Sequence, residues 1–229
     1  MTRIIPFAVG EYYHAYNRGV DKRKVFLDRA DYERFLGLLY LCNSGNLIHR
    51  SDMERWSFQE LLSFPREEML VDIGAYCLMS NHFHLLLHEH AEGGISKFMQ
   101  KLGIAYTMFF NKRRERTGAL FEGTFRARHA NTDEYLKYLF AYIHLNPIGI
   151  VESEWKDHRI QDKKKAEEQL RTYRYSSYLD YAQPEKQRPE AIILNKSAFP
   201  EYFERPKDFS DHVNDWLALA EEAPPLFKK

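Results

Sequence analysis

Two histidines stand two residues apart in the segment Asn81-His82-Phe83-His84-Leu85-Leu86-Leu87. Side chains on a β-strand alternate between its two faces, so His82 and His84 would share one face while the apolar residues occupy the other. Two imidazoles on one face can bind a single divalent metal ion. His88 and His90 have the same parity, so spacing alone does not say which pair binds a metal. For so short a pattern, histidines satisfied by backbone or solvent are the more common explanation.

A tyrosine and an asparagine, Tyr142 and Asn146, lie four residues apart in the segment Ala141-Tyr142-Ile143-His144-Leu145-Asn146-Pro147. On a continuous helix they project from one face, which would place a phenol nucleophile beside an amide oxygen able to ligate a metal. Two structural explanations compete with this one. Tyr135, Tyr138 and Tyr142 have the spacing of an aromatic core stripe, and an asparagine before a proline is a common helix stop.

Basic and aromatic residues lie between and around these two segments. Such residues can line a groove that neutralises phosphates and stacks unpaired bases. A solvated charged face explains them equally well. The residues are Lys101, Lys112, Arg113, Arg114, Arg116, Phe121, Phe125, Arg126 and Arg128.

The elements that must position these residues follow from hydrophobic periodicity and turn residues. The pattern predicts strands over Gly10–Arg18, Val71–Leu78 and His82–His88, with another within Gly118–Ala130. It predicts one helix through Phe35 to Cys42 capped by Asp31, one from Gly94 through Phe109, and one from Glu134 to Leu145 capped by Asp133. The first six elements have the βαββαβ order of a ferredoxin-like α+β domain, an antiparallel sheet covered by helices on one face.

Two regions fall outside this order. Residues from about 43 to 70 are mixed and polar and are predicted to form an insertion with one short helix around Phe58–Leu62. After Val151 the sequence becomes charged and rich in tyrosine, which predicts a mostly helical C-terminal extension over residues 151–229 beside a catalytic domain of residues 1–150. The extension should contain a helix over Lys163–Arg171, an aromatic element over Tyr173–Tyr181 and a terminal helix over Ser210–Glu222.

Composition restricts the class of protein. The chain has 229 residues, of which 44% are hydrophobic and 15% aromatic, enough for an ordinary core. Its 33 basic and 33 acidic residues cancel, which argues against coating DNA by bulk charge but not against a local basic face. The two cysteines, Cys42 and Cys77, lie in apolar stretches and indicate reduced core thiols. With no signal peptide and no membrane span in the sequence, we expect a cytoplasmic protein.

Five separated blocks, in this order, resemble the REP-associated tyrosine transposases, a branch of the insertion-sequence-200-like transposases in the single-tyrosine HUH endonuclease superfamily. The resemblance extends from about Tyr12 to Tyr181. Neither the insertion over residues 43–70 nor the tail after Tyr181 corresponds to a family feature. The blocks are Asn17–Phe26 with Asp31-Tyr32, Tyr76–Leu86, Gly118–Arg126, Tyr142–Pro147 and Tyr173–Tyr178.

This resemblance implies a catalytic domain with the histidine pair on a central strand. It implies that Tyr142 is the nucleophile and that His82, His84 and Asn146 bind a divalent metal ion, for which Mg²⁺ or Mn²⁺ suits the mixed nitrogen and oxygen ligands. The implied substrate is single-stranded DNA beside a short REP-like hairpin, cleaved and rejoined through a 5′-phosphotyrosine intermediate.

The same resemblance sets the expected partners. We expect a monomer in a bacterial, nucleoid-associated cytoplasmic setting, with DNA and no membrane as partner. The residues expected to contact DNA are Arg18, Arg23, Lys112, Arg113, Arg114, Arg116, Arg126 and Arg128.

Two other functions remain open at this point. The chain could be a catalytically silent protein that binds hairpin DNA, although the presence of all four candidate site residues favours activity. It could also be a metal-dependent hydrolase that activates water at His82 and His84. That hydrolase would not need Tyr142 and would leave no protein–DNA adduct.

Overall fold

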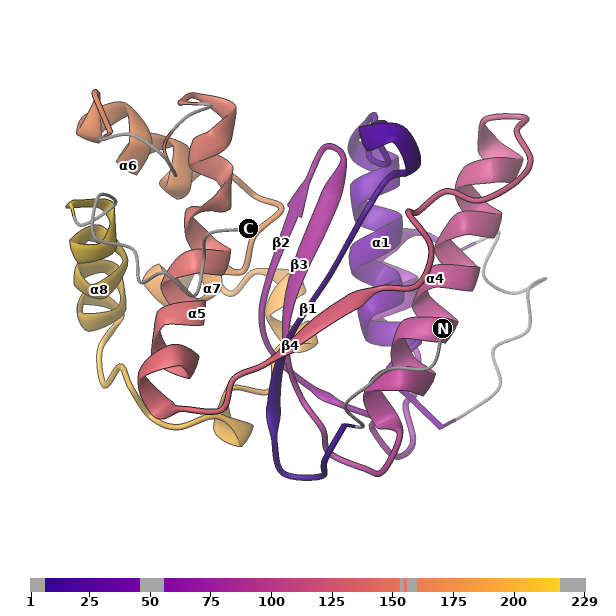
Figure 1. Ribbon diagram of the computed structural model, residues 1–229, viewed down its shortest axis with the longest axis horizontal. Coiled ribbons are helices and arrows are strands. Elements are labelled where there is room, and N and C mark those ends of the chain that lie inside the picture. Colours follow the sequence, from indigo (N-terminus) through magenta and orange to yellow (C-terminus); the bar gives the residue numbers. More distant parts are fainter. Residues whose placement is uncertain (1–6, 46–55, 153–154, 156–159, 219–229) are drawn as a thin grey trace.

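The computed structural model describes residues 7–45, 56–152, 155 and 160–218. At its centre is a four-stranded antiparallel sheet with the strand order β2-β3-β1-β4 (Figure 1). The strands are β1 (Tyr12–Arg18), β2 (Asp72–Met79), β3 (His82–His88) and β4 (Arg126–His129). With a helix after β1 and another after β3, the chain has the βαββαβ order that the sequence predicts, so the α+β fold class is confirmed.

One face of the sheet is covered by α1 (Arg29–Leu41) and α4 (Gly94–Arg113), and the short helix α3 (Phe58–Ser63) lies against α1. Burial of aromatic rings joins these layers: Phe35 of α1 contacts both Phe83 of β3 and Tyr106 of α4, with ring centroids 4.9 Å apart in each pair. Such burial is the main favourable contribution to the stability of a core of this kind.

The predicted insertion contains α3 and has well-fixed ends. The buried side chain of Asn43 accepts from the amides of Leu70 and Val71 and donates to the carbonyl of Val71, at 2.8–3.0 Å. One amide side chain therefore joins the two ends of the insertion by satisfying three backbone groups. Residues 46–55 of the predicted insertion lie outside the described residues.

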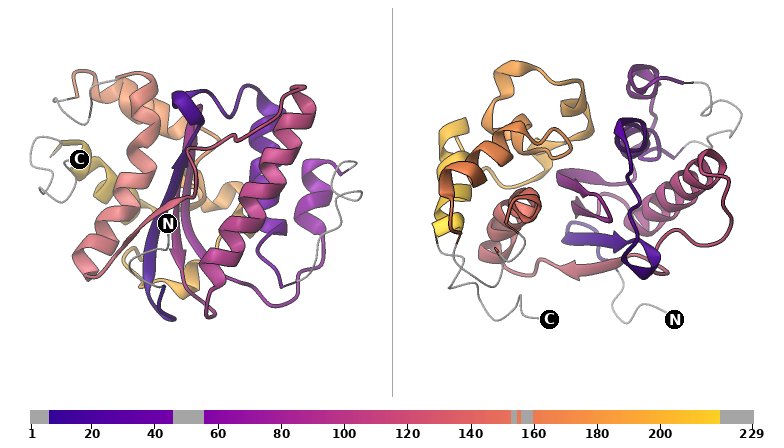
Figure 2. Two further views of the ribbon diagram at one scale, coloured as in Figure 1. Left: turned by 45° about the vertical axis from the view of Figure 1, so that its right-hand side comes forward. Right: turned by 90° about the horizontal axis from the view of Figure 1, so that it is seen from above.

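The second face of the sheet is covered by α5 (Asp133–Leu145) and the C-terminal extension, so the sheet has helices on both faces (Figure 2). The extension contains α6 (Lys163–Thr172), α7 (Tyr178–Ala182) and α8 (Pro206–Ala218). Short 3₁₀ turns lie between the helices and strands: η1 (Val20–Lys22) follows β1, and η2 (Asn146–Ile150) follows α5. Three more lie between α7 and α8, namely η3 (Pro184–Lys186), η4 (Pro189–Ile193) and η5 (Lys196–Ala198).

The segment before α7 pairs with the outer edge of β2. The amide of Leu78 donates to the carbonyl of Tyr175 at 2.9 Å, and the amide of Ser177 donates to the carbonyl of Tyr76 at 3.0 Å. The block Tyr173–Tyr178 of the sequence therefore satisfies backbone groups that an edge strand otherwise leaves unpaired.

A glycine in β2 allows the extension to approach closely. Gly74 lies at an irregularity in the pairing of β2 with β3. A Cβ atom at this position would lie only 2.6 Å from the ring of Phe199, and the Tyr181 hydroxyl donates to the Gly74 carbonyl at 2.6 Å. A side chain here would push the extension off the sheet.

Helix boundaries differ from the sequence-based expectation at three places. The N-cap of α1 is Asp28, which accepts from the amide of Asp31, and the N-cap of α5 is Thr132, not Asp133. Both predicted caps lie inside the first turn, because the capping residue precedes the helix and bonds an amide three residues later. The terminal helix begins at Pro206 instead of Ser210, because proline is well tolerated in the first turn of a helix. Residues 219–222 of the predicted helix lie outside the described part of the chain.

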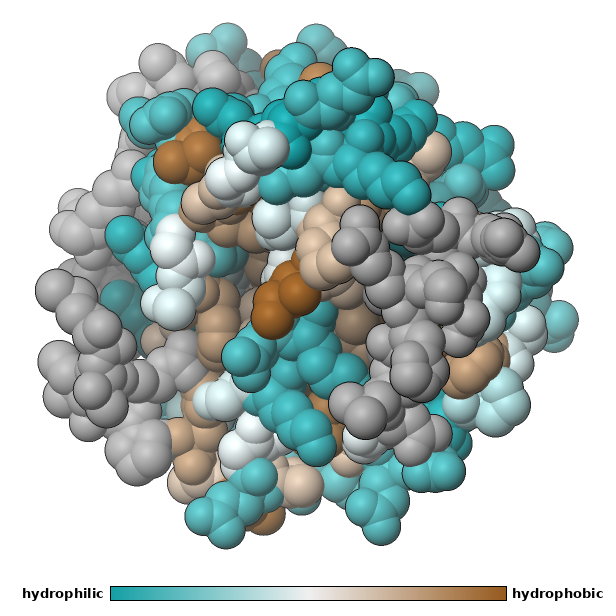
Figure 3. All heavy atoms as spheres, turned by 90° about the vertical axis from the view of Figure 1, so that its right-hand side faces the viewer, coloured by the Kyte–Doolittle hydropathy of each residue, from teal (hydrophilic) through white to brown (hydrophobic). Residues whose placement is uncertain are grey.

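The outer side of α4 faces solvent. Figure 3 shows this side as largely hydrophilic, with hydrophobic residues in separate spots rather than one patch. Two of the exposed hydrophobic residues in α4 are Ile104 and Met108. Within the described residues, no helix is both long and apolar enough to cross a membrane.

Candidate functional site

The pairing register places the histidine pair on the sheet face that α5 covers. Directly opposed residues of antiparallel strands point to the same face. Tyr16 of β1 is opposite His84 on one side and Arg126 of β4 on the other, and Arg18 is opposite His82. His82 and His84 therefore share a face with each other, as strand alternation predicts, and with basic residues of two neighbouring strands.

Each of the two histidines is oriented through its Nδ1 atom. The Nδ1 atom of His82 lies 2.7 Å from Oδ1 of Asn81, and Nδ1 of His84 lies 2.8 Å from Nε2 of His14. The amide nitrogen of Asn81 donates to the Lys22 carbonyl, which assigns Oδ1 as the atom facing His82. His82 therefore donates through Nδ1, which leaves its lone pair on Nε2.

Tyr142 of α5 lies over the same face. Its ring meets the rings of His84 and His14 edge-on, with centroids 5.7 and 5.6 Å apart. Tyr142 is half-buried, whereas Tyr138 and Tyr135 are buried, and burial raises the pKa of both of these hydroxyls. Of these three tyrosines, Tyr142 thus combines contact with His84 and access to solvent.

Asn146 caps the C-terminus of α5, one turn after Tyr142. Its amide nitrogen donates to the carbonyls of Tyr142 and Ile143 at 2.8 and 3.3 Å, so the amide oxygen is the group that can ligate a metal. Figure 1 shows α5 running toward the end of the sheet at which β2 turns into β3, where His82 begins the strand. The helical-face relation between Tyr142 and Asn146 is as the sequence predicts.

The residues fit a divalent metal ion in the chemistry of their donors. Metal-binding histidines usually donate their other ring nitrogen to a fixed partner, which sets the ring orientation. His82, His84 and Asn146 all have their non-ligating nitrogen in a hydrogen bond. Across the described ranges of the chain, no three His, Cys, Asp or Glu side chains converge as a metal site.

The second histidine pair has a different role. The Nδ1 atoms of His88 and His90 lie 2.8 and 3.3 Å from one carboxylate oxygen of Asp72, a side chain with 1% exposure. A buried carboxylate needs such partners, because it would otherwise be costly to desolvate. His88 and His90 thus satisfy Asp72, whereas Tyr142 contacts His84, so His82 and His84 form the candidate pair beside the tyrosine.

Several residues expected to contact DNA are paired with carboxylates. Arg113 and Arg114 both contact Asp28 and the fully buried Asp31, with nitrogen–oxygen distances of 2.6–2.8 Å. Arg18 forms two parallel hydrogen bonds of 3.0 Å with Glu122. These three arginines have structural partners that sequence inspection does not reveal.

The other expected DNA contacts fall into two groups. The guanidinium group of Arg116 bonds Asn111 and the Ala119 carbonyl, and that of Arg23 folds back to the Val20 carbonyl. Lys112, Arg126 and Arg128 are exposed. Among the two aromatic residues expected to stack bases, Phe121 is buried in the core against Phe83, and Phe125 stacks on Phe7.

Sequence reasoning missed three residues that complete the site. His14 and Tyr16 alternate on the predicted first strand, and their rings stack with centroids 5.0 Å apart beside His84. Their parity could have indicated a shared face, but only the pairing of β1 with β3 places that face beside His84. The third residue, Asn81, directly precedes the histidine pair in the sequence, and its side-chain oxygen orients His82.

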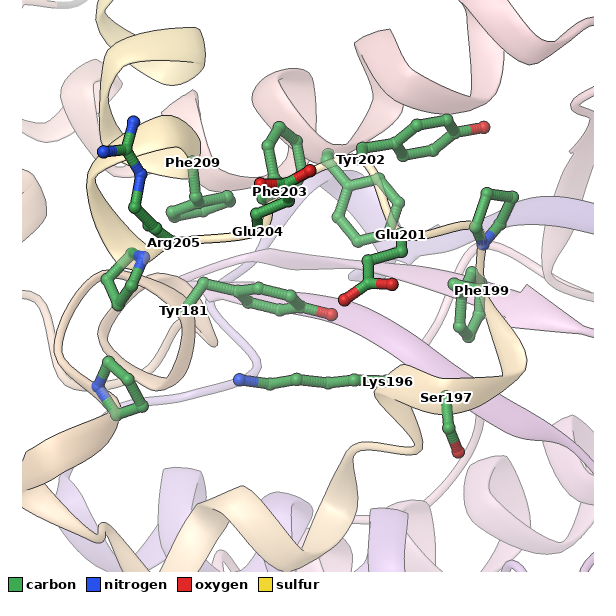
Figure 4. A pocket seen from close by; sticks show the side chains of 14 residues that line it. Tyr181, Lys196, Ser197, Phe199, Glu201, Tyr202, Phe203, Glu204, Arg205 and Phe209 are labelled. Atoms are coloured by element: carbon green, nitrogen blue, oxygen red, sulfur yellow. The ribbon is translucent and has the colours of Figure 1, made fainter.

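A separate cavity of about 540 Å³ lies in the extension (Figure 4). Its walls are mainly aromatic and include Phe140, Tyr181 and Phe203. The Lys196 ammonium lies 4.2 Å from the centre of the Tyr181 ring, and burial lowers the pKa of Lys196. Neither the histidine pair nor Tyr142 lines this cavity.

Just under half of the chain is similar to a known protein family. Residues 42–146 match the family model described as "Transposase IS200 like", and this segment contains both histidines, Tyr142 and Asn146. The match confirms the family resemblance that the sequence motifs indicate. Among solved structures, a REP-associated tyrosine transposase bound to a REP hairpin is similar, with 13% identity, a TM-score of 0.49 and coverage of 80% of this chain and 87% of that one. No curated protein matches the chain.

Proposed function

We propose that the chain is a metal-dependent endonuclease and strand transferase for single-stranded DNA, with Tyr142 as its nucleophile. The observation that carries the proposal is the edge-on contact of the Tyr142 ring with His84, at a centroid distance of 5.7 Å. Both residues belong to one chain, so we propose that Tyr142 acts at the metal site of its own chain and that a monomer suffices.

His82, His84 and Asn146 would hold the ion. When bound, a divalent cation supplies positive charge that polarises a phosphate oxygen. A neutral tyrosine hydroxyl is a weak nucleophile, so a polarised phosphate would favour attack by Tyr142. The role of the protein is to fix the hydroxyl in line with the scissile phosphorus.

The proposed reaction is a balanced exchange of phosphate esters. The Tyr142 hydroxyl oxygen bonds to phosphorus and its proton passes to solvent, while the bond from phosphorus to the 3′ oxygen breaks and that oxygen takes up a proton. The products are a 5′-phosphotyrosine and a free 3′ hydroxyl. The ester retains its energy, so the 3′ hydroxyl of another strand can attack it and restore both DNA and free tyrosine.

Phosphate contacts are proposed for Arg126 and Arg128, which are exposed on β4 and share the sheet face of the histidines. Lys112 at the end of α4 is a further exposed cation. We exclude Arg113 and Arg114 from this group, because leaving Asp31 buried without them would offset the gain from binding a phosphate.

The test is to incubate the protein with end-labelled, hairpin-containing single-stranded DNA and Mn²⁺ and to separate the products on a denaturing gel. We expect a covalent protein–DNA adduct that is lost in Tyr142→Phe and kept in Tyr138→Phe, the matched control one turn earlier. Asn146→Ala should weaken Mn²⁺ binding and leave the nucleophile in place.

The other outcomes identify other functions. Cleavage without an adduct would indicate hydrolysis by water at the histidine pair. Binding without cleavage would indicate a catalytically silent hairpin-binding protein. An adduct that persists in Tyr142→Phe would assign the nucleophile to Tyr138 or Tyr135.

A further inference from the structure

We propose that His14 is a positioning residue that fixes the tautomer of His84, so that the Nε2 lone pair of His84 would be available to a metal ion. The proposal rests on the metal-dependent function proposed above. Its structural basis is the hydrogen bond of 2.8 Å between Nε2 of His14 and Nδ1 of His84, two rings that are each 6% exposed.

The direction of this one hydrogen bond decides whether His84 can ligate. A neutral imidazole carries its proton on one nitrogen and its lone pair on the other. If Nδ1 of His84 accepted from His14, its Nε2 would carry the proton and could not bind a metal. If Nδ1 of His84 donates to His14, the lone pair lies on Nε2.

His82 already has the tautomer that a ligand needs, because its Nδ1 atom faces an oxygen of Asn81 that can only accept. Both histidines then present Nε2 lone pairs on one sheet face only if His84 has the same tautomer. His14 therefore has to be the acceptor, with its own proton on Nδ1.

The position of His14 is rigid, as an orienting group requires. It lies on β1, next to β3 in the sheet, and its ring stacks on His84 and Tyr16 with both centroid distances 5.0 Å. His14 does not act as a ligand through Nε2 in this arrangement, because that nitrogen faces His84.

The first measurement needs no metal and no DNA. Long-range ¹H–¹⁵N spectra of the ¹⁵N-labelled, metal-free protein report which ring nitrogen of His84 is protonated, with the signals assigned from a His84→Gln protein. We expect the proton on Nδ1 in the unaltered protein. A proton on Nε2 would overturn the proposal.

Variants then test whether His14 is responsible. His14→Leu removes the acceptor and should shift His84 toward the Nε2-protonated tautomer, whereas His14→Gln retains an acceptor and should preserve the Nδ1-protonated form. The matched control is His129→Leu, a histidine on β4 whose partner is Glu11. An unchanged tautomer in a folded His14→Leu protein would contradict the proposal. If that protein does not fold, the unaltered and His14→Gln proteins decide.

Metal affinity gives the second readout, by Mn²⁺ titration followed with electron paramagnetic resonance. Loss of an orienting partner typically weakens metal binding about 10–100-fold, which we expect for His14→Leu and not for His14→Gln or His129→Leu. Equal affinity in all four proteins would refute the positioning role. If the unaltered protein has the expected tautomer but binds no Mn²⁺, the proposed function fails while the hydrogen-bond assignment stands.

Discussion

The buried carboxylate of Asp31 gives a stability prediction that also tests how the nearby arginines are used. Its oxygens lie 2.6 Å from Arg113 and 2.8 Å from Arg114, and one of them accepts from the Leu27 amide at 2.9 Å. The Asp31 side chain has 0% exposure, whereas the arginine side chains keep 34% and 30%. Asp31→Asn preserves the shape of the side chain and removes its charge.

Removing one partner of a buried ion pair typically costs 3–5 kcal/mol. The partial exposure of the arginines lets water reach them after the change, so we expect the low end, about 3 kcal/mol of unfolding free energy. The control is Asp28→Ser, which keeps an N-cap oxygen but removes an ion-pairing carboxylate that is 41% exposed; it should cost less than about 1 kcal/mol.

Urea denaturation followed by circular dichroism would measure both losses. Equal losses for Asp31→Asn and Asp28→Ser would refute the reasoning, because burial would then have no influence on the value of the ion pair. A loss of less than about 1 kcal/mol for Asp31→Asn would show that the two arginines are as well satisfied by water as by the carboxylate.

Two further predictions concern pH and salt. In the folded chain, burial lowers the pKa of His144 to about 3 and raises the pKa of Asp180 to about 6. Between about pH 4 and 6, the unfolded chain therefore binds a proton at His144 that the folded chain lacks, and lacks a proton at Asp180 that the folded chain binds. These two differences change stability with pH in opposite directions. In Asp180→Asn, the unfolding free energy should fall by up to about 1.4 kcal/mol for each unit of decreasing pH, and in His144→Gln it should rise with decreasing pH. Urea titrations at about pH 4–7 would measure both profiles. Profiles unchanged in both variants would exclude this linkage. For DNA, Arg126→Gln should reduce the slope of log affinity against log salt by about 0.7, as expected for one phosphate contact to a single strand. Arg114→Gln should leave that slope unchanged, and an equal reduction would show that its ion pair opens on binding.

The parts of the site that could be predicted depend on local geometry. The shared face of His82 and His84 follows from strand alternation, and the relation of Tyr142 to Asn146 follows from one helical turn. Both are properties of a few consecutive residues. The strand and helix order was predictable for the same reason, since each element has its own hydrophobic period.

The missed parts depend on pairing between distant segments. His14 and His84 are 70 residues apart, and Arg114 and Asp31 are 83 residues apart. No local period records which residue of β1 lies opposite which residue of β3, or which carboxylate a basic helix end reaches. The cover of the second sheet face was missed for the same reason, because it depends on where a tyrosine-rich extension packs.

The pairing of residues 174–177 with β2 has a consequence for how the protein can be divided. A boundary at residue 150, suggested by composition, would separate the candidate site residues from the extension but would also expose the outer backbone of β2 to solvent. An unprotected edge of that kind recruits strands from other molecules. We therefore expect a chain shortened to residues 1–150 to self-associate, which light scattering would detect. The extension would then protect the protein against aggregation, besides covering the apolar β2 part of the second sheet face.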